Sequence, residues 1–224
     1  MPRKIKSPTR TISNAGEHPR FIGLLTSPKA ATKPVSTGAW GVLQYDSLSA
    51  MLCAVYLEWR SDVASFSFEP RRYRFAANDN LAALDCIPDF EAVLTTGEVV
   101  VFEAKYGREE MRNKERDKLA LATAHFALAG IPYDVVYRLE LERGGFIDTV
   151  FLLRQYGHHP YAEALLDEAQ RRLASVDRAD LWEWRRRAAT ARVPTSVLYH
   201  LLYWQRLPLE YRPLQFEELQ LWRG

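Results

Sequence analysis

The segment EVVVFEAKY, residues 98–106, constrains the fold of this chain more than any other. Its four consecutive apolar residues, 99–102, place hydrophobic side chains on both sides of an extended strand. A strand of this kind is stable inside a sheet that has another layer packed on each face. The chain therefore has to build a layer on both sides of a sheet, and its 224 residues suffice for a core of that size.

Helical and extended patterns alternate on either side of this strand. Apolar residues recur at helical spacing from Leu48 to Trp59, after candidate N-caps at Asp46 and Ser47. Thr96-Gly97 predicts a hairpin turn between the strand and an extended stretch at 86–96. This order predicts an α/β fold with a mixed sheet flanked by helices. The other expected elements are strands at 63–75, interrupted at Pro70, and at 133–141, and a helix at 109–129.

The pattern changes after Gly144-Gly145, beyond which helical spacing dominates. The clearest helix there is TSVLYHLLYW, 195–204, and the segment 206–222 is expected to be extended. A helix-turn-helix with a wing is one form that this part can take. We predict three parts: a basic extended arm at 1–20, an α/β domain at 21–145, and a smaller, mainly helical domain at 146–224 that contacts DNA or a partner.

Basic residues gather near the N-terminus although the net charge of the chain is only +2. Residues 1–44 contain seven lysines and arginines against Glu17 alone. Such an arm can follow a phosphate backbone, although a solvated terminus has the same composition. The candidate DNA contacts in this region are Arg3, Lys4, Lys6, Arg10, Lys29 and Lys33.

A second basic segment, LWEWRRRAATAR at 181–192, combines two tryptophans with four arginines. A helix that buries its tryptophans and exposes its arginines to water explains the pattern. A helix that contacts phosphates explains it as well. The candidate DNA contacts here are Arg185, Arg186 and Arg187.

Two acids and a lysine are expected to meet at one edge of the sheet. Asp89 opens one strand of the hairpin, and antiparallel pairing can bring it beside Glu103 in the other. Two neighbouring carboxylates are costly unless a cation neutralises them, and Mg²⁺, or Mn²⁺ in its place, prefers such oxygen ligands. The Ala104 carbonyl can supply another oxygen, and Lys105 can orient or help to deprotonate a water. The pattern predicts metal-dependent phosphodiester hydrolysis, although charged residues on the solvent-exposed side of an ordinary hairpin would give the same sequence pattern.

Pro88-Asp89 followed by Glu103-Ala104-Lys105 resembles the core of the PD-(D/E)XK nuclease superfamily. More narrowly, the chain resembles the TnsA family, the endonuclease subunit of heteromeric cut-and-paste transposases, over about residues 20–140 and weakly at 196–214. This resemblance implies a Mg²⁺-dependent endonuclease that cleaves double-stranded transposon ends at the 5′ side. It also implies a DDE-type transposase and an AAA+ ATPase regulator as partners, in the cytoplasm of a prokaryote at its nucleoid.

The chain departs from this family at the helix before the first strand. Ala50 stands where the resemblance leads us to expect a glutamate that completes the metal site. Asp46, one turn earlier on the same face, can replace it or cap the helix. Glu58, two turns later, is the other candidate, and a solvated helix end explains it better. A restriction or repair nuclease therefore remains open, as does a subunit that kept the fold for DNA binding or transposase assembly but lost catalysis.

The remaining cysteines and histidines lack the spacing of a metal site. Cys53 and Cys86 are expected to be buried, reduced thiols of a cytosolic protein. His158 and His159 are expected in a loop, and His125 and His200 in the core or against a partner. No run is long and apolar enough to cross a bilayer, so we expect no membrane association.

Overall fold

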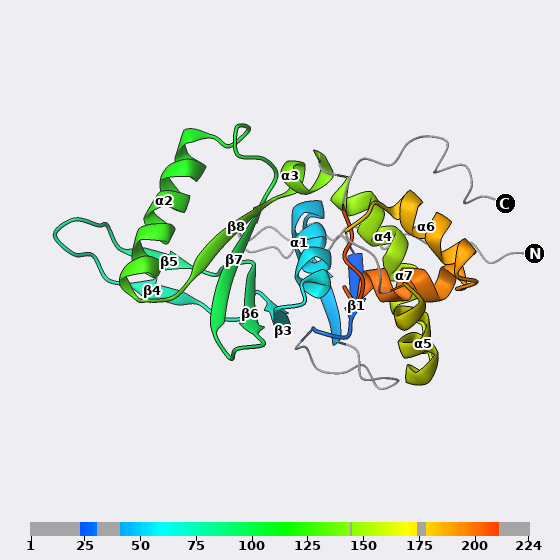
Figure 1. Cartoon of the computed structure of the whole chain (residues 1–224). Coiled ribbons are helices and arrows are strands. Elements are labelled where there is room, and N and C mark those ends of the chain that lie inside the picture. Colours follow the sequence, from blue (N-terminus) through cyan, green and yellow to red (C-terminus); the bar gives the residue numbers. More distant parts are fainter. Residues whose placement is uncertain (1–22, 31–40, 144, 174–177, 211–224) are drawn as a thin grey trace, which may run out of the picture.

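The computed structural model describes residues 23–30, 41–143, 145–173 and 178–210. The described part is elongated, with the central sheet and α2 (Asn113–Leu128) toward one end, α1 (Leu48–Trp59) in the middle and a group of helices at the other (Figure 1). None of the helices in these ranges is long and apolar enough to span a bilayer. Five of the candidate DNA contacts, Arg3, Lys4, Lys6, Arg10 and Lys33, lie outside the described residues.

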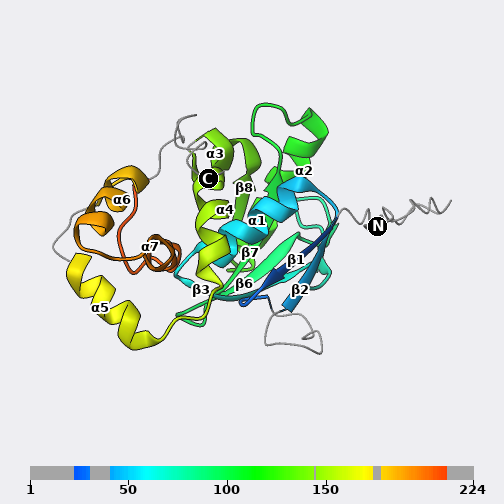
Figure 2. The ribbon, with the colours of Figure 1, turned by 90° about the vertical axis from the view of Figure 1, so that its right-hand side faces the viewer.

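A four-stranded mixed sheet carries two helical layers. Its strands run in the order β3 (Val63–Phe68), β6 (Phe90–Leu94), β7 (Val99–Lys105) and β8 (Tyr133–Tyr137), with β8 parallel to β7 and the other pairs antiparallel. In β7, Val101 and Phe102 are both fully buried although they point to opposite faces. Helix α1 packs on the Phe102 face and α2 on the Val101 face (Figure 2). The predicted α/β fold with a mixed sheet between helices is confirmed.

Two short antiparallel ribbons lie outside this sheet. They are β1 (Gly23–Ser27) with β2 (Gly41–Tyr45), and β4 (Tyr73–Phe75) with β5 (Leu84–Cys86). The expected strand at 63–75 is interrupted around Pro70, as predicted, and its two parts join different sheets. The hairpin turn between β6 and β7 is also confirmed, with Gly97 at a φ of 85° that favours glycine.

Three segment predictions need correction. The strand expected at 86–96 is broken between Cys86 and Phe90, because Pro88 has no N–H for a sheet hydrogen bond. The strand expected at 133–141 ends at Tyr137, and α3 (Arg138–Arg143) follows directly, with Arg138 paired to Glu142 one turn later at 2.6 Å. Helix α2 begins at Asn113 rather than at residue 109.

The C-terminal part is helical and shares the core of the sheet domain. Its helices are α4 (Phe146–Gly157), α5 (Glu163–Leu173), α6 (Leu181–Thr190) and α7 (Thr195–Tyr203). Phe146 packs edge-on against Trp59 of α1, with ring centroids 5.0 Å apart, and one cluster of buried residues joins α1, α4 and α7. The core is thus continuous across residue 145, the limit of the two predicted domains. Between 146 and 210 the described residues form no strand beyond a bridge at Ala179 and Leu209, and most of the expected extended stretch lies outside them.

A buried carboxylate links α1 to the C-terminal helices. The side chain of Glu58 is completely buried and accepts hydrogen bonds from Nε and Nη2 of Arg154, each at 3.0 Å. It is also 2.7 Å from Nε2 of His158 and accepts from the Tyr203 hydroxyl. Burial disfavours the charged form, but these partners outweigh it and lower the pKa of Glu58 to about 2. The expectation that Glu58 belongs to a solvated helix end is therefore wrong.

We expect Glu58→Gln to lower the free energy of unfolding at pH 7 by about 3 kcal/mol, because the partly buried Arg154 would lose the carboxylate charge that it pairs with. The folded-state pKa of Glu58 lies below the unfolded value of 4.5, so its stabilisation is present above pH 4.5 and lost as the pH falls toward 2. Urea unfolding of both proteins between pH 7 and pH 3 should show this difference shrinking. Glu140→Gln, at an exposed ion pair with Arg108, is the matched control and should change stability little. An equal loss in both variants would contradict the assignment.

Candidate active site

The pairing of β6 with β7 places the two predicted acids side by side. Phe90 lies opposite Phe102 in the antiparallel register, so Asp89, one residue earlier, lies opposite Glu103. The Asp89 carboxylate accepts a hydrogen bond of 2.7 Å from the Ala104 N–H. This bond fixes the carboxylate at the point where β6 begins, beside the end of β7.

The backbone of β7 also directs an oxygen toward Asp89. The N–H of Val101 donates to Pro132 on the β8 side, whereas the N–H of Ala104 donates to Asp89 on the β6 side. Within a strand, the N–H and C=O of one residue point to the same side. The Ala104 carbonyl therefore faces the same edge as the Asp89 carboxylate, as a third ligand oxygen would have to.

The electrostatics of this edge are unfavourable for two charged acids. Burial raises the pKa of Asp89 to about 7, and the nearby charges of Glu103 and Asp46 raise it as well, against the lowering effect of the Ala104 N–H and Lys105. Lys105 lies 2.5 Å from Glu103. Burial acts to lower the pKa of Lys105, but Glu103 and Asp89 outweigh it and the net pKa is raised. Lys105 is thus an ammonium at neutral pH, suited to orient a water or phosphate rather than to act as a base.

The structure separates the two candidates for a third acid. Ser47 caps α1, because its hydroxyl accepts from the Ala50 N–H at 3.0 Å, so Asp46 is not the capping residue. Asp46 lies close enough to raise the pKa of Asp89. Glu58 lies roughly 18 Å further along the helix and is held by Arg154, His158 and Tyr203. Asp46 is therefore the one of the two acids beside the site.

This donor set fits a small, hard cation. Within the described ranges no cluster of three or more metal-ligating side chains is found. Two carboxylates, a carbonyl and a third acid nearby are the arrangement that Mg²⁺ accepts, because Mg²⁺ keeps several of its waters. The buried Asp89, repelled by Glu103, is a site where added positive charge is stabilising. Asp89, Glu103 and the Ala104 carbonyl are the groups that would hold the ion.

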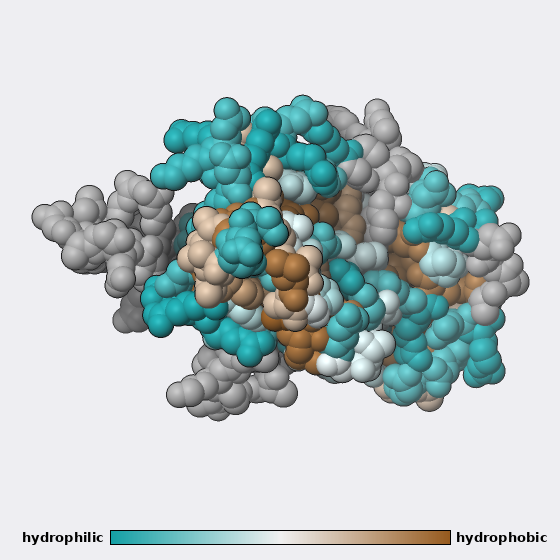
Figure 3. Space-filling model, turned by 90° about the vertical axis from the view of Figure 1, so that its left-hand side faces the viewer, coloured by the Kyte–Doolittle hydropathy of each residue, from teal (hydrophilic) through white to brown (hydrophobic). Residues whose placement is uncertain are grey.

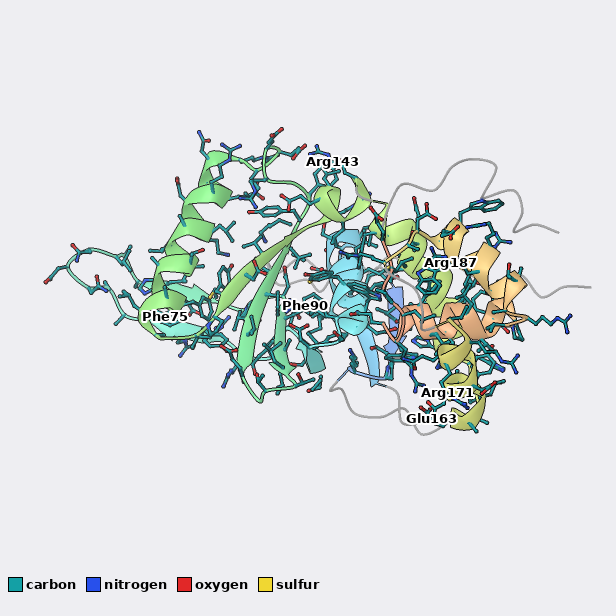
Figure 4. The ribbon with its side chains drawn as sticks, viewed as in Figure 1. Phe75, Phe90, Arg143, Glu163, Arg171 and Arg187 are labelled. Atoms are coloured by element: carbon teal, nitrogen blue, oxygen red, sulfur yellow. The ribbon has the colours of Figure 1, made fainter. Side chains whose placement is uncertain are left out.

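The candidate DNA contacts that the structure describes lie apart from this edge. The Lys29 ammonium donates to the Arg60 carbonyl at 2.5 Å, and burial lowers its pKa. Arg186 and Arg187 both pair with Glu183, while Arg185 lies over the ring of Trp182. Figure 4 labels Phe90 in the sheet and Arg187 in α6, in well-separated parts of the molecule. Trp184 is buried as expected, but Trp182 is 47% exposed, so the expectation that both tryptophans point inward is wrong for Trp182.

A pocket beside the site was not foreseen from the sequence. It lies between α2 and the sheet, and Glu103 and Lys105 belong to its lining together with Glu115 and Lys118 of α2. Positions 115, 118, 122 and 126 share one helical face, and this spacing is the sequence feature that could have indicated one wall of the pocket.

The cysteines and histidines only partly follow expectation. Cys53 is a fully buried free thiol, whereas Cys86 is only partly buried and borders the pocket. His125 is buried, as expected. His158 belongs to the Glu58 network, so its structural role was missed.

Comparison with known proteins gives no independent assignment: no protein-family model matches the chain, and no curated protein is significantly similar to it.

We expect Asp89→Asn to stabilise the metal-free protein at pH 8 by up to about 4 kcal/mol, because the amide oxygen still accepts from Ala104 while the buried charge is gone. The pKa of Asp89 rises on folding from 3.8 to about 7, so wild-type stability is lost as the pH rises across this range. The stability difference between variant and wild type should therefore grow from about pH 4 to pH 7 and then stay constant. Urea unfolding in EDTA at pH 4, 6 and 8 measures it, and a pH-independent difference would contradict the burial of this charge.

Proposed function

We propose that this protein is a metal-dependent DNA endonuclease. The observation that carries the proposal is the position of Asp89 beside Glu103, next to the Ala104 carbonyl and the Lys105 ammonium. Buried acids with raised pKa values and an unbalanced charge are characteristic of functional sites. The resemblance of Pro88-Asp89 and Glu103-Ala104-Lys105 to the PD-(D/E)XK nucleases supports the same chemistry.

Each residue has a defined task in this proposal. Mg²⁺, when bound, supplies a Lewis acid for the phosphate and a water of lowered pKa. Asp89 and Glu103 would hold the ion, and Asp89 would have to lose its proton for this, so binding would strengthen as the pH rises to about 7 and level off above it. Lys105 leaves its ion pair with Glu103 and orients the attacking water or the charged phosphate oxygens. Asp46, at the start of α1, would take the place of the acid that Ala50 does not supply.

We further propose that the substrate is a transposon end in double-stranded DNA, cut at the 5′ side. This narrower assignment rests on the resemblance to the TnsA family over about residues 20–140. It carries with it a DDE-type transposase and an AAA+ ATPase as partners, and a place in the cytoplasm of a prokaryote, at the nucleoid. The basic arm and Arg185, Arg186 and Arg187 are the proposed contacts to DNA outside the cleavage site.

A second candidate function is a nuclease-fold subunit that binds DNA or assembles a transposase without cutting. The observation that favours it is Ala50, a buried residue at the position where the resemblance leads us to expect an acid. A restriction or repair nuclease with the same chemistry is the remaining alternative. Metal affinity separates the non-cutting subunit from both nucleases, because a silenced site has no need to hold an ion.

We expect Mn²⁺ to bind the wild-type protein and not Asp89→Ala, as measured by calorimetry with and without DNA. The variant loses the carboxylate that accepts a hydrogen bond from Ala104, in the strand that carries Glu103, and with it one of the proposed ligands. Glu91→Ala is the control, because Glu91 lies two residues further along β6 and pairs with Arg71 and Tyr73 instead. Absence of binding in the wild type under both conditions would favour the non-cutting subunit.

We expect Lys105→Ala to reduce DNA cleavage by at least about a hundredfold while the fold stays intact, because the variant cannot stabilise the charge that develops on the phosphate. The measurement is cleavage of labelled transposon-end DNA with the transposase and ATPase partners present, accompanied by circular dichroism. Lys114→Ala, at an exposed lysine of α2, should cut at the wild-type rate. Wild-type cleavage by Lys105→Ala would refute the mechanism.

A further inference from the structure

The cleft between α2 and the central sheet opens directly beside the proposed cleavage site. It has a volume of about 160 Å³. Glu103 and Lys105 of β7 line one side, and Glu115 and Lys118 of α2 line another. Because Glu103 and Lys105 belong both to the cleft and to the cleavage site, whatever occupies the cleft lies next to a phosphate bound there.

The rest of the lining is apolar and aromatic. Phe126 and Tyr133 stack on each other with ring centroids 4.8 Å apart, and Ala122 beside them leaves space that a larger side chain would fill. Tyr133 is partly buried, and this burial raises the pKa of its hydroxyl well above the usual value. On the side of the molecule that carries α2, apolar surface lies exposed among hydrophilic side chains (Figure 3).

We propose that this cleft binds one unpaired nucleotide of the DNA strand whose phosphate lies at Asp89 and Glu103. The inference rests on the proposed nuclease site for the position of that phosphate. It adds a preference that the nuclease chemistry does not require: the strand enters with a base taken out of the double helix.

Size and charge favour a base over other occupants. A base pair does not fit a cleft of this volume, whereas a single base does. Two ammonium groups and two carboxylates balance each other on the walls, so the cleft does not select an isolated anion. Carboxylates accept hydrogen bonds from exocyclic amino groups of bases, and aromatic side chains stack on any base.

A neighbouring residue has the chemistry to keep the base out of the helix. Ile87 lines the cleft, directly precedes Pro88-Asp89, and is 47% exposed. An exposed aliphatic side chain at this place can fill the gap left in the base stack, as apolar wedges do when proteins open a base step.

The chain carries its own reporter for occupancy of the cleft. Cys86 lines it and is partly accessible, whereas Cys53 is fully buried in the core. Alkylation of the native protein therefore reports on Cys86, and Cys86→Ser should remove the fast reaction. Burial raises the pKa of Cys86, so the rate is best followed at about pH 8.5, where more thiolate is present.

We expect an oligonucleotide duplex with an unpaired base to slow alkylation of Cys86 by at least about fivefold at saturation, because base stacking stabilises the occupied cleft. A fully paired duplex of the same length should slow it less than about twofold. Fluorescence anisotropy on the same samples measures how much DNA is bound. Equal protection by both duplexes, bound DNA without protection, or no binding of either DNA would each overturn the proposal.

Two lysines of α2 provide a matched pair of variants. Lys118→Ala should lose most of the protection, whereas Lys114→Ala, one turn earlier and outside the cleft, should keep it. Lys118 lowers the pKa of Cys86, so its removal changes the alkylation rate by itself. The rate of each variant with DNA is therefore compared with the rate of the same variant without DNA. Ala122→Leu should fill the cleft and abolish protection, while Ala120→Leu, exposed on the same helix, should not.

The protection experiment is done in EDTA, which separates it from the nuclease proposal. Protection without any Mn²⁺ binding would keep the nucleotide cleft and remove the metal-dependent chemistry. Mn²⁺ binding that depends on Asp89, without protection of Cys86, would keep the nuclease and remove the nucleotide cleft.

Discussion

The register between β6 and β7 is the constraint on which both the core and the candidate site depend. Phe90 and Phe102 face each other in this register, and both are fully buried against α1. A shift of one residue would turn these rings to the other face of the sheet, where α2 packs. The same pairing sets Asp89 opposite Glu103, so the hydrophobic core holds two carboxylates together although they repel each other. Packing thus sets the backbone positions of the site, and the Ala104 N–H then fixes the Asp89 carboxylate.

The sequence predicted the parts of the fold that depend on local patterns. The apolar run at 99–102 indicated a strand covered on both faces, and Thr96-Gly97 indicated the turn that brings Asp89 to Glu103. The segment at 138–141 was missed because its alternating apolar residues suit a strand, while the i, i+4 pair of Arg138 with Glu142 favours a helix. The burial of Glu58 was also missed, since its partners come from 96 to 145 residues further along the chain. No residue near Glu58 in the sequence indicates its contact with these partners.

The cleft between α2 and the sheet shows the same limit at the candidate site. Spacing along α2 identifies a common face for Glu115, Lys118 and Phe126, but it does not say what that face meets. The opposite wall comes from β7, and the two are brought together only because β8 returns parallel to β7 after α2. Topology therefore creates this site, and a sequence pattern alone could not reveal it.

Asp89 and Glu58 are two buried acids whose environments shift their pKa values in opposite directions. Glu58 has Arg154, His158 and Tyr203 as partners, so its charge is satisfied and its pKa falls to about 2. The pKa of Asp89 is raised to about 7 by its burial and by the charge of Glu103, and the single N–H of Ala104 offsets only part of this. The chain therefore has the means to stabilise a buried carboxylate and does not use them at the end of the sheet. An acid left in that state costs stability near pH 7 and above, and a bound cation would restore it. This contrast is why we place the chemistry at Asp89 and assign Glu58 to the scaffold.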